Sequence, residues 1–155
     1  MKLTVESASA RETKAWGKRL ASGLRGGELI GLSGEIGAGK TCFVKGLAMG
    51  LELDEADILS PTFTMIQEHS GRVNLYHIDL YRLDSARLDD MGLREYLFSD
   101  GIAAVEWFER LREAPELECL AITIGFADAG RRTIEFESRG PRYDGVIGHL
   151  GTFVH

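Results

Sequence analysis

Residues 34–41 read Gly-Glu-Ile-Gly-Ala-Gly-Lys-Thr and match the phosphate-binding pattern G-x-x-x-x-G-K-[ST] at every specified position. Glycines let successive backbone N–H groups curl around phosphate oxygens, and the helix that follows directs the positive end of its dipole at them. In such a loop Lys40 reaches the β- and γ-phosphates, and the Thr41 hydroxyl is a ligand of Mg²⁺. The loop therefore predicts a site for a nucleoside triphosphate.

The segments on either side of this loop have the patterns that it requires. Residues 29–32 form a short apolar run, as expected for a parallel strand that is buried on both faces. After the loop, apolar residues from Phe43 to Ala48 follow a helical spacing that ends near Gly50. A strand, a glycine-rich loop and a helix in this order predict a three-layer α/β domain of the P-loop NTPase-like type.

Two pairs of strand-like segments indicate hairpins. A Ser-Gly turn at residues 70–71 separates residues 64–69 from residues 73–80, and a second hairpin joins residues 120–126 to residues 133–137. The strands of a hairpin are antiparallel, whereas the strand before the phosphate-binding loop is typical of a parallel sheet. The predicted sheet is therefore mixed, with parallel and antiparallel neighbours.

Shorter signals locate the other elements. Ser9 and Glu12 have the spacing of a capping box, so a helix is expected to begin there and to stop at the Gly26-Gly27 pair. The other expected elements are a first strand (2–5), two short helical pieces broken near Gly92 (88–98) and a buried strand (102–105). The Gly-rich tail from Gly140 onward receives no assignment.

Length and composition favour one soluble domain over residues 1–155. The chain has 18 basic and 24 acidic residues, a formal net charge of −6, which argues against broad nonspecific binding of nucleic acid or of an anionic membrane. Cys42 and Cys119 have no metal-binding or disulfide-framework spacing, so a reducing cytoplasmic location is expected. No apolar stretch approaches the ~18 residues of a membrane span, and no signal peptide is recognisable.

Two carboxylates follow apolar strand-like runs and are candidates for the metal and the water. Asp79 closes residues 73–78, and Glu106 closes residues 102–105. If both strands neighbour the strand before the loop, both side chains lie at the carboxyl edge of the sheet, near the phosphates. One carboxylate would then bind Mg²⁺ while the other orients or deprotonates water. An exposed charge at a strand end is the alternative interpretation.

Four further features have two interpretations each. Residues 60–63 (Ser-Pro-Thr-Phe) are either a γ-phosphate sensor or a turn fixed by proline. His77 shares a strand face with Asp79 and either joins the water network or is a structural histidine. Trp107 either contacts nucleotide or anchors the core, and composition alone favours the core. Cys42 is either a redox switch or a packing residue, and packing is favoured.

Five motifs in order and spacing resemble the TsaE (YjeE) family, whose members are bacterial ATPases of tRNA threonylcarbamoyladenosine (t6A) biosynthesis. These motifs are residues 34–41, 60–63, 77–83 (His-Ile-Asp-Leu-Tyr-Arg-Leu), 92–96 (Gly-Leu-Arg-Glu-Tyr) and 106–107 (Glu-Trp). Together the matching residues extend over most of the chain, and the four motifs outside the phosphate-binding loop are more specific than that loop.

The resemblance implies roles at the phosphates and the metal. The implied phosphate-binding residues are Gly37, Ala38, Gly39, Lys40, Thr41 and Cys42. Thr41 and Glu106 are the implied Mg²⁺ ligands. Asp79 matches a carboxylate thought to act in hydrolysis, so the implied catalytic residues are Lys40, Asp79 and Glu106.

The resemblance also places residues beside the rest of the ATP. Ala10 and Arg131 match positions next to the nucleotide, and Trp107 is then near the nucleotide as well, against the preference from composition. Two positions depart from the family pattern: Cys42 stands where a second Thr is common, and Phe108 stands where Pro is common.

Partners are implied by the resemblance alone. Family members act with TsaD and TsaB, and ATP hydrolysis allows the tRNA-modifying reaction to turn over. The net charge of −6 agrees with tRNA being held mainly by other subunits. Two other functions use the same loop: a small-molecule kinase and a nucleotide-gated binding module that does not require hydrolysis. In the kinase, Arg110 and Arg112 would form a lid, but a solvated helix face is the favoured interpretation of these two arginines. A GTPase is disfavoured because the chain has no Asn-Lys-x-Asp motif.

Overall fold

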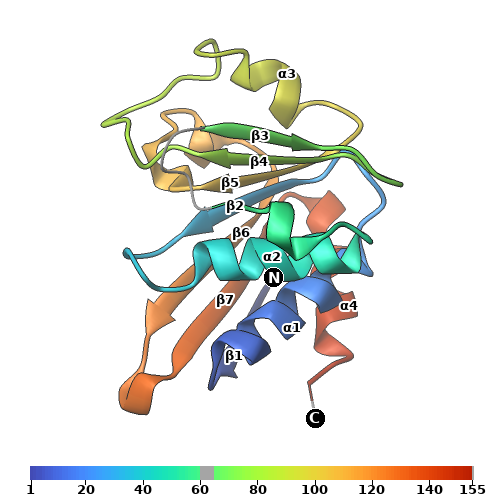
Figure 1. Cartoon of the computed structure of the whole chain (residues 1–155), viewed down its shortest axis with the longest axis vertical. Coiled ribbons are helices and arrows are strands. Elements are labelled where there is room, and N and C mark those ends of the chain that lie inside the picture. Colours follow the sequence, from blue (N-terminus) through green and yellow to red (C-terminus); the bar gives the residue numbers. More distant parts are fainter. Residues whose placement is uncertain (60–64, 155) are drawn as a thin grey trace.

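The computed structural model describes residues 1–59 and 65–154. In these residues seven strands form one sheet in the order β1-β7-β6-β2-β5-β4-β3 (Figure 1). The strands are β1 (Lys2–Ser7), β2 (Leu29–Ser33), β3 (Ile66–His69), β4 (Leu75–Asp79), β5 (Ile102–Glu106), β6 (Cys119–Phe126) and β7 (Arg132–Arg139). The helices are α1 (Ala10–Ala21), α2 (Lys40–Gly50), α3 (Leu93–Leu97) and α4 (Asp144–Gly151). The proposed γ-phosphate sensor, residues 60–63, lies outside the described residues.

The centre of the sheet is parallel and its outer strands are antiparallel. β2 pairs in parallel with both β5 and β6, and β5 pairs in parallel with β4. β3 is antiparallel to β4, and β7 is antiparallel to both β6 and β1. The predicted α/β class, the mixed sheet and both predicted hairpins are therefore confirmed.

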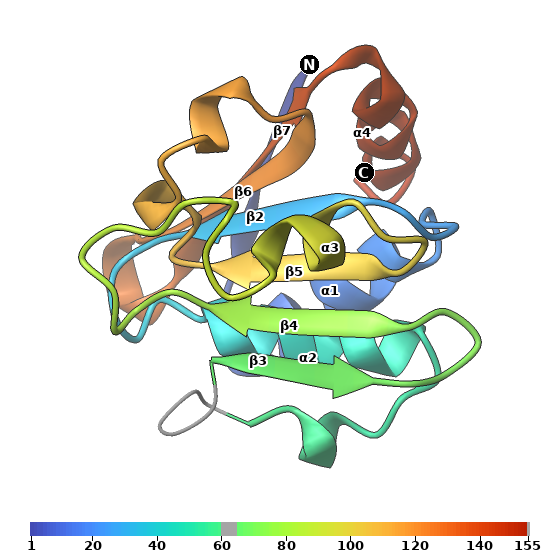
Figure 2. The same ribbon diagram turned by 90° about the horizontal axis from the view of Figure 1, so that it is seen from above.

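Helices cover both faces of the sheet, which gives three layers. Figure 2 shows α3 on one side of the strands and α1 and α2 on the other. The first hydrophobic core lies beneath α1, α2 and α4 and includes Phe43, Leu47 and Phe136. The second core lies on the opposite face, beneath α3, and includes Leu80, Leu93 and Phe108. Burial on both faces explains why β2 and β5 carry no charged side chain before the last residue of each strand.

The capping box begins α1 as predicted. The backbone N–H of Glu12 donates to Ser9 Oγ at 3.1 Å, and the Glu12 carboxylate accepts from the N–H of Ala8 at 2.6 Å. The helix ends at Ala21, earlier than the Gly26-Gly27 pair that was expected to stop it.

The structure differs from the predicted elements at residues 88–98 and adds a helix in the tail. Residues 88–98 were expected to hold two helical pieces, but in the structure residues 88–92 are turns and only α3 is an α-helix. Met91 and Gly92 have positive φ values of 55° and 68°, which a continuing right-handed helix does not allow. The unassigned tail contains α4, which is held on the first core by Val146, Ile147 and Leu150.

A glycine contact joins α1 to α2 and sets the position of the phosphate-binding helix. A Cβ atom on Gly17 would lie 2.3 Å from the Phe43 carbonyl oxygen, and one on Gly46 would lie 2.0 Å from the Lys14 carbonyl oxygen. The two backbones therefore approach so closely that no larger side chain fits between them.

Gly46→Ala is expected to lower the free energy of unfolding by about 1–3 kcal/mol, because the added methyl group forces α1 and α2 apart. Denaturant unfolding followed by circular dichroism measures this loss. Gly148→Ala is the control, because Gly148 is exposed within α4 and a Cβ there meets no atom within 4 Å. The control should gain roughly 0.5–1 kcal/mol. Equal effects at both positions would contradict the close contact.

Candidate functional site

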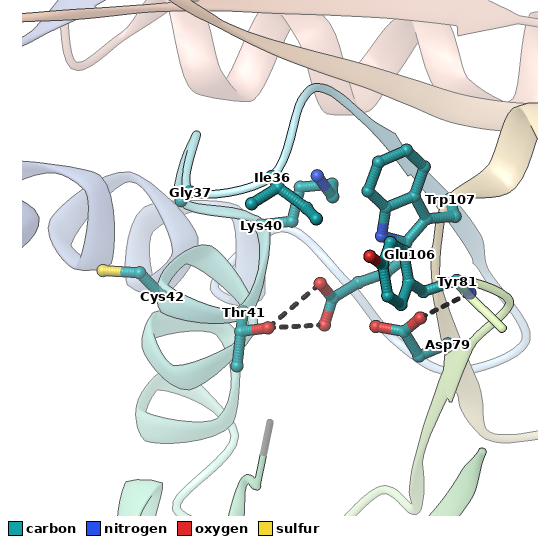
Figure 3. A pocket seen from close by; sticks show the side chains of 10 residues that line it. Ile36, Gly37, Lys40, Thr41, Cys42, Asp79, Tyr81, Glu106 and Trp107 are labelled. Carbon is teal, nitrogen blue, oxygen red and sulfur yellow. Dashed lines mark hydrogen bonds between the residues drawn. The ribbon is translucent and has the colours of Figure 1, made fainter. Parts of the chain in front are cut away.

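Three parallel strands end at the same edge of the sheet and bring the predicted site residues together. β2 leads into the phosphate-binding loop, Asp79 ends β4 and Glu106 ends β5. Asp79 is the register partner of Glu106, and Glu106 is also the partner of Leu32 on β2. A pocket of about 370 Å³ opens there (Figure 3). Its lining residues are Ile36, Gly37, Gly39, Lys40, Thr41, Cys42, Asp79, Tyr81, Glu106 and Trp107.

The loop has the backbone conformation that its glycines permit. Gly34, Gly37 and Gly39 have φ values of 150°, 79° and 115°, in the range that L side chains rarely adopt. Gly39 is the N-cap of α2 and makes no side-chain capping bond, so the first N–H groups of this helix remain open to a ligand. These features suit a bound phosphate group.

Lys40 is almost fully buried and is held by the loop itself. Its Nζ donates to the carbonyl oxygens of Gly34 and Glu35, the latter at 2.9 Å, and lies 4.3 Å from the centroid of the Trp107 ring. Burial lowers the pKa of the ammonium group, and the nearby Glu106 carboxylate counteracts this shift. Backbone carbonyls thus hold the cation in a position next to the pocket.

Glu106 connects the loop helix to the sheet. The Thr41 hydroxyl, at the start of α2, donates to both carboxylate oxygens of Glu106 at 3.0 Å (Figure 3). On the other side, His77 Nε2 lies 2.5 Å from Glu106 Oε2. Glu106 is 2% exposed. Its buried carboxylate is therefore held by Thr41 from α2 and by His77 from β4 rather than by solvent.

Asp79 lies beside Glu106 but has a different environment. Its Oδ1 accepts the backbone N–H of Tyr81 at 2.7 Å, and the residue is 4% exposed. Burial raises the pKa of this carboxyl to about 6, and the hydrogen bond from Tyr81 partly offsets the increase. A carboxylate with such a pKa at the wall of this pocket is a candidate general base.

The oxygen donors of this pocket fit Mg²⁺. Thr41 and Glu106 present a hydroxyl and a carboxylate at one point on the pocket wall, and hard oxygen ligands are those that Mg²⁺ prefers. Within residues 1–59 and 65–154, no group of three or more His, Cys, Asp or Glu side chains is arranged to hold a metal.

A second pocket of about 220 Å³ lies on the other side of the loop and includes Ala10, Cys42 and Arg132. The Cys42 thiol donates to the Ala10 carbonyl oxygen at 3.3 Å, and burial raises the pKa of this thiol. Arg131, the arginine expected beside the nucleotide, instead pairs with Glu6 at 3.2 Å. Its neighbour Arg132 contacts the loop, with Nε donating to the Ala38 carbonyl at 3.2 Å.

Trp107 lies at the wall of the first pocket and also packs against the second core. Its φ of 57° is unusual for a residue with a side chain and turns the chain sharply after β5. The Arg110 guanidinium carbon lies 4.6 Å from the ring centroid of Trp107, and Tyr81 packs at 5.2 Å between centroids. Arg110, one of the two arginines expected to form a lid in a kinase, also donates to the Leu83 carbonyl at 3.1 Å.

Six residues of these pockets are absent from the predicted site. Ile36 and Tyr81 line the first pocket, and the second is lined in part by Ser9, Thr13, Gly130 and Arg132. The sequence carries a signal for Tyr81, because Tyr81 follows Asp79 by two residues in the motif at residues 77–83. Ile36 lies inside the loop pattern at a position that the pattern leaves unspecified.

Comparison with known proteins identifies the family. A family model described as "Threonylcarbamoyl adenosine biosynthesis protein TsaE" matches residues 7–134. The chain belongs to the TsaE family. Within the described residues, no helix has the length and apolar character needed to cross a membrane.

Relatives and a solved structure agree with this TsaE assignment. Proteins of Treponema pallidum and Bacillus subtilis, both named tRNA threonylcarbamoyladenosine biosynthesis protein TsaE, are 43% and 39% identical to this chain. The first alignment covers 81% of this chain and 93% of the relative, and the second covers 89% and 87%. The crystal structure of YdiB from Bacillus subtilis superposes with a TM-score of 0.81 at 34% identity, covering 100% of this chain and 97% of YdiB.

Asp79→Asn is expected to stabilise this TsaE-family chain at neutral pH. Because the pKa of Asp79 rises from 3.8 to about 6 on folding, the folded protein holds this proton more tightly than the unfolded chain. The contribution of Asp79 to the free energy of unfolding therefore falls as the pH rises from about 4 to 6 and then levels off. Asparagine carries no such penalty, so the variant should be more stable by about 1–3 kcal/mol above pH 6.5 and nearly equal at pH 4.

Thermal unfolding of both proteins between pH 4 and 8 measures this difference. Asp84→Asn is the matched control, because Asp84 is exposed and should change stability little at any pH. A stability difference between Asp79→Asn and wild type that stays constant across this range would rule out the raised pKa.

Proposed function

We propose that this TsaE-family chain is a Mg²⁺-dependent ATPase that supports t6A modification of tRNA. The observation that carries the proposal is the meeting of Lys40, Thr41, Asp79 and Glu106 in one pocket at the carboxyl ends of β2, β4 and β5. The names of the Treponema and Bacillus relatives support the t6A part of the proposal.

The loop and the start of α2 would bind the phosphates of ATP. Backbone N–H groups from Gly37 to Cys42 would surround the phosphate oxygens, and the Lys40 ammonium would leave the loop carbonyls to reach the β- and γ-phosphates. Thr41 and Glu106 would hold Mg²⁺, which supplies positive charge to the phosphates in the transition state. Lys40 would supply further positive charge at the same oxygens.

The two carboxylates would have different roles, with Glu106 binding the metal and Asp79 positioning water. Because Glu106 already accepts from Thr41 and lies against His77, its carboxylate is the better placed of the two for the metal. Asp79 has one oxygen occupied by the Tyr81 N–H and a pKa of about 6, which suits a group that accepts a proton near neutral pH. We therefore assign the orientation and deprotonation of water to Asp79.

The second pocket is proposed to take the adenosine part of ATP. Ala10 and Cys42 line it beside the loop, and Arg132 closes it from β7. Arg131 stays a proposed nucleotide contact from the family resemblance, and it would have to leave Glu6 to make that contact. Trp107 would border the phosphates, since its ring already contacts the Lys40 ammonium.

The proposed partners are proteins of the TsaD and TsaB type. The chain is proposed to act in the cytoplasm and to contact tRNA only through these partners. Hydrolysis by the chain alone is expected to be slow, because P-loop switches commonly need a partner to complete the site. The small-molecule kinase stays the alternative enzyme; Arg110, one of the two arginines of its expected lid, is held against Trp107 and the Leu83 carbonyl. A nucleotide-gated binding module differs from the ATPase in one measurable respect: it supports repeated t6A formation without hydrolysis.

Lys40→Ala and Glu106→Ala are each expected to slow repeated t6A formation roughly 10–100-fold in a mixture of TsaD, TsaB, tRNA and saturating ATP. Lys40→Ala removes positive charge at the phosphates, and Glu106→Ala removes a proposed metal ligand. Removing a charged hydrogen-bonding group costs about 1.5–3 kcal/mol, which gives this factor. The amount of t6A per molecule of the TsaE-family chain over time measures turnover. Lys18→Ala is the control, because Lys18 is exposed on α1, and it should turn over like wild type.

Repeated cycles at the wild-type rate with both variants at saturating ATP would show that hydrolysis is not required and would favour the binding module. Phosphorylation of a metabolite by the wild-type chain would favour the kinase instead.

A further inference from the structure

His77 is buried beside Glu106, and the proposed function gives it no part in phosphate binding or water activation. The residue is 1% exposed, and Nε2 lies 2.5 Å from Glu106 Oε2. In the register of β4 and β5, His77 faces Ala104, and the next pair on the same face is Asp79 with Glu106. The small side chain of Ala104 leaves room for the imidazole ring to reach diagonally to Glu106.

The hydrogen-bond pattern indicates which ring nitrogen carries the proton. Both oxygens of Glu106 accept the Thr41 hydroxyl, so this side chain acts as an acceptor. Nε2 must then be the donor in the contact between His77 and Glu106. Nδ1 is buried and has no hydrogen-bond partner among residues 1–59 and 65–154.

We propose that His77 is a positioning residue that fixes the Glu106 carboxylate for the metal. Its Nε2–H holds Oε2 from the sheet side while Thr41 approaches from α2, so the carboxylate is fixed between two donors. Groups that orient a metal ligand in this way commonly change metal affinity 10–100-fold when removed. The inference rests on the proposed function, because it assumes that Glu106 is a ligand of Mg²⁺.

Packing alone is a poor account of this histidine. A buried nitrogen without a partner costs free energy, whereas an apolar side chain of similar size would fill the same space without that cost. The bond to Glu106 is the feature that an apolar side chain cannot supply. His77→Leu is therefore expected to fold, and its deficit should concern the metal.

The test compares wild type, His77→Leu and His77→Gln, whose side-chain amide can place an N–H donor near the position of Nε2. The protein is saturated with a non-hydrolysable ATP analogue, and Mg²⁺ is titrated in while calorimetry reports the half-saturating concentration. His77→Leu should raise this concentration about 10–100-fold, and His77→Gln should restore it to within about threefold of wild type. Binding of the analogue in EDTA should be the same for all three proteins.

A mutant cycle with Glu106→Gln ties the effect to that carboxylate. His77→Leu should have no further effect on Mg²⁺ in the Glu106→Gln background, because the group that it positions is already gone. An equal loss in both backgrounds, or a loss in His77→Gln as large as in His77→Leu, would overturn the positioning role. So would a His77→Leu protein that binds Mg²⁺ like wild type.

Ring nitrogen NMR of the wild-type protein gives a test that needs no variant to fold. The expected spectrum shows a proton on Nε2 of His77, and a proton on Nδ1 alone would overturn the proposal. Failure of the proposed function looks different: wild type itself would then show no Mg²⁺-dependent binding of the analogue.

Discussion

Parallel pairing of β4 and β5 with β2 is the constraint on which the site depends. Parallel strands end at the same edge of a sheet, so the phosphate-binding loop, Asp79 and Glu106 meet although they are far apart in sequence. A shift of one residue along β4 would turn Asp79 to the opposite face, where α3 and its core lie. The two apolar cores hold this register, and the glycine contact between α1 and α2 fixes the start of α2 above it.

The same edge gathers buried charge, which is costly unless it is compensated. Lys40, Asp79 and Glu106 are each at most 5% exposed. Lys40 is compensated by loop carbonyls and Glu106 by Thr41 and His77, while Asp79 is compensated less and has a raised pKa. Such under-compensated groups are typical of functional sites. Burying the ionised Asp79 carboxylate therefore lowers the stability of the fold at the residue proposed to position water.

Local signals explain which parts of this protein were predictable. The loop pattern, the hairpin turns and the two strand-end carboxylates each depend on a few adjacent residues, and the strands, helix and pocket that they predicted are present. Strand order depends on long-range packing, so the sequence did not reveal that β6 lies beside β2. Arg131 and Arg132 are adjacent where β7 begins, and side-chain contacts across the fold distinguish them: Arg131 pairs with Glu6, and Arg132 contacts the loop. The helix α4 is stabilised by tertiary packing of a glycine-rich segment, which local propensity does not indicate.

Calorimetric titration of ATP into the folded wild-type chain, with Mg²⁺ and with EDTA, tests the central claim most directly. The account predicts saturable binding of one ATP per chain, at least about tenfold tighter when Mg²⁺ is present, because Thr41 and Glu106 add metal ligands to the phosphate site. Absence of Mg²⁺-dependent ATP binding by protein that circular dichroism shows to be folded would contradict it.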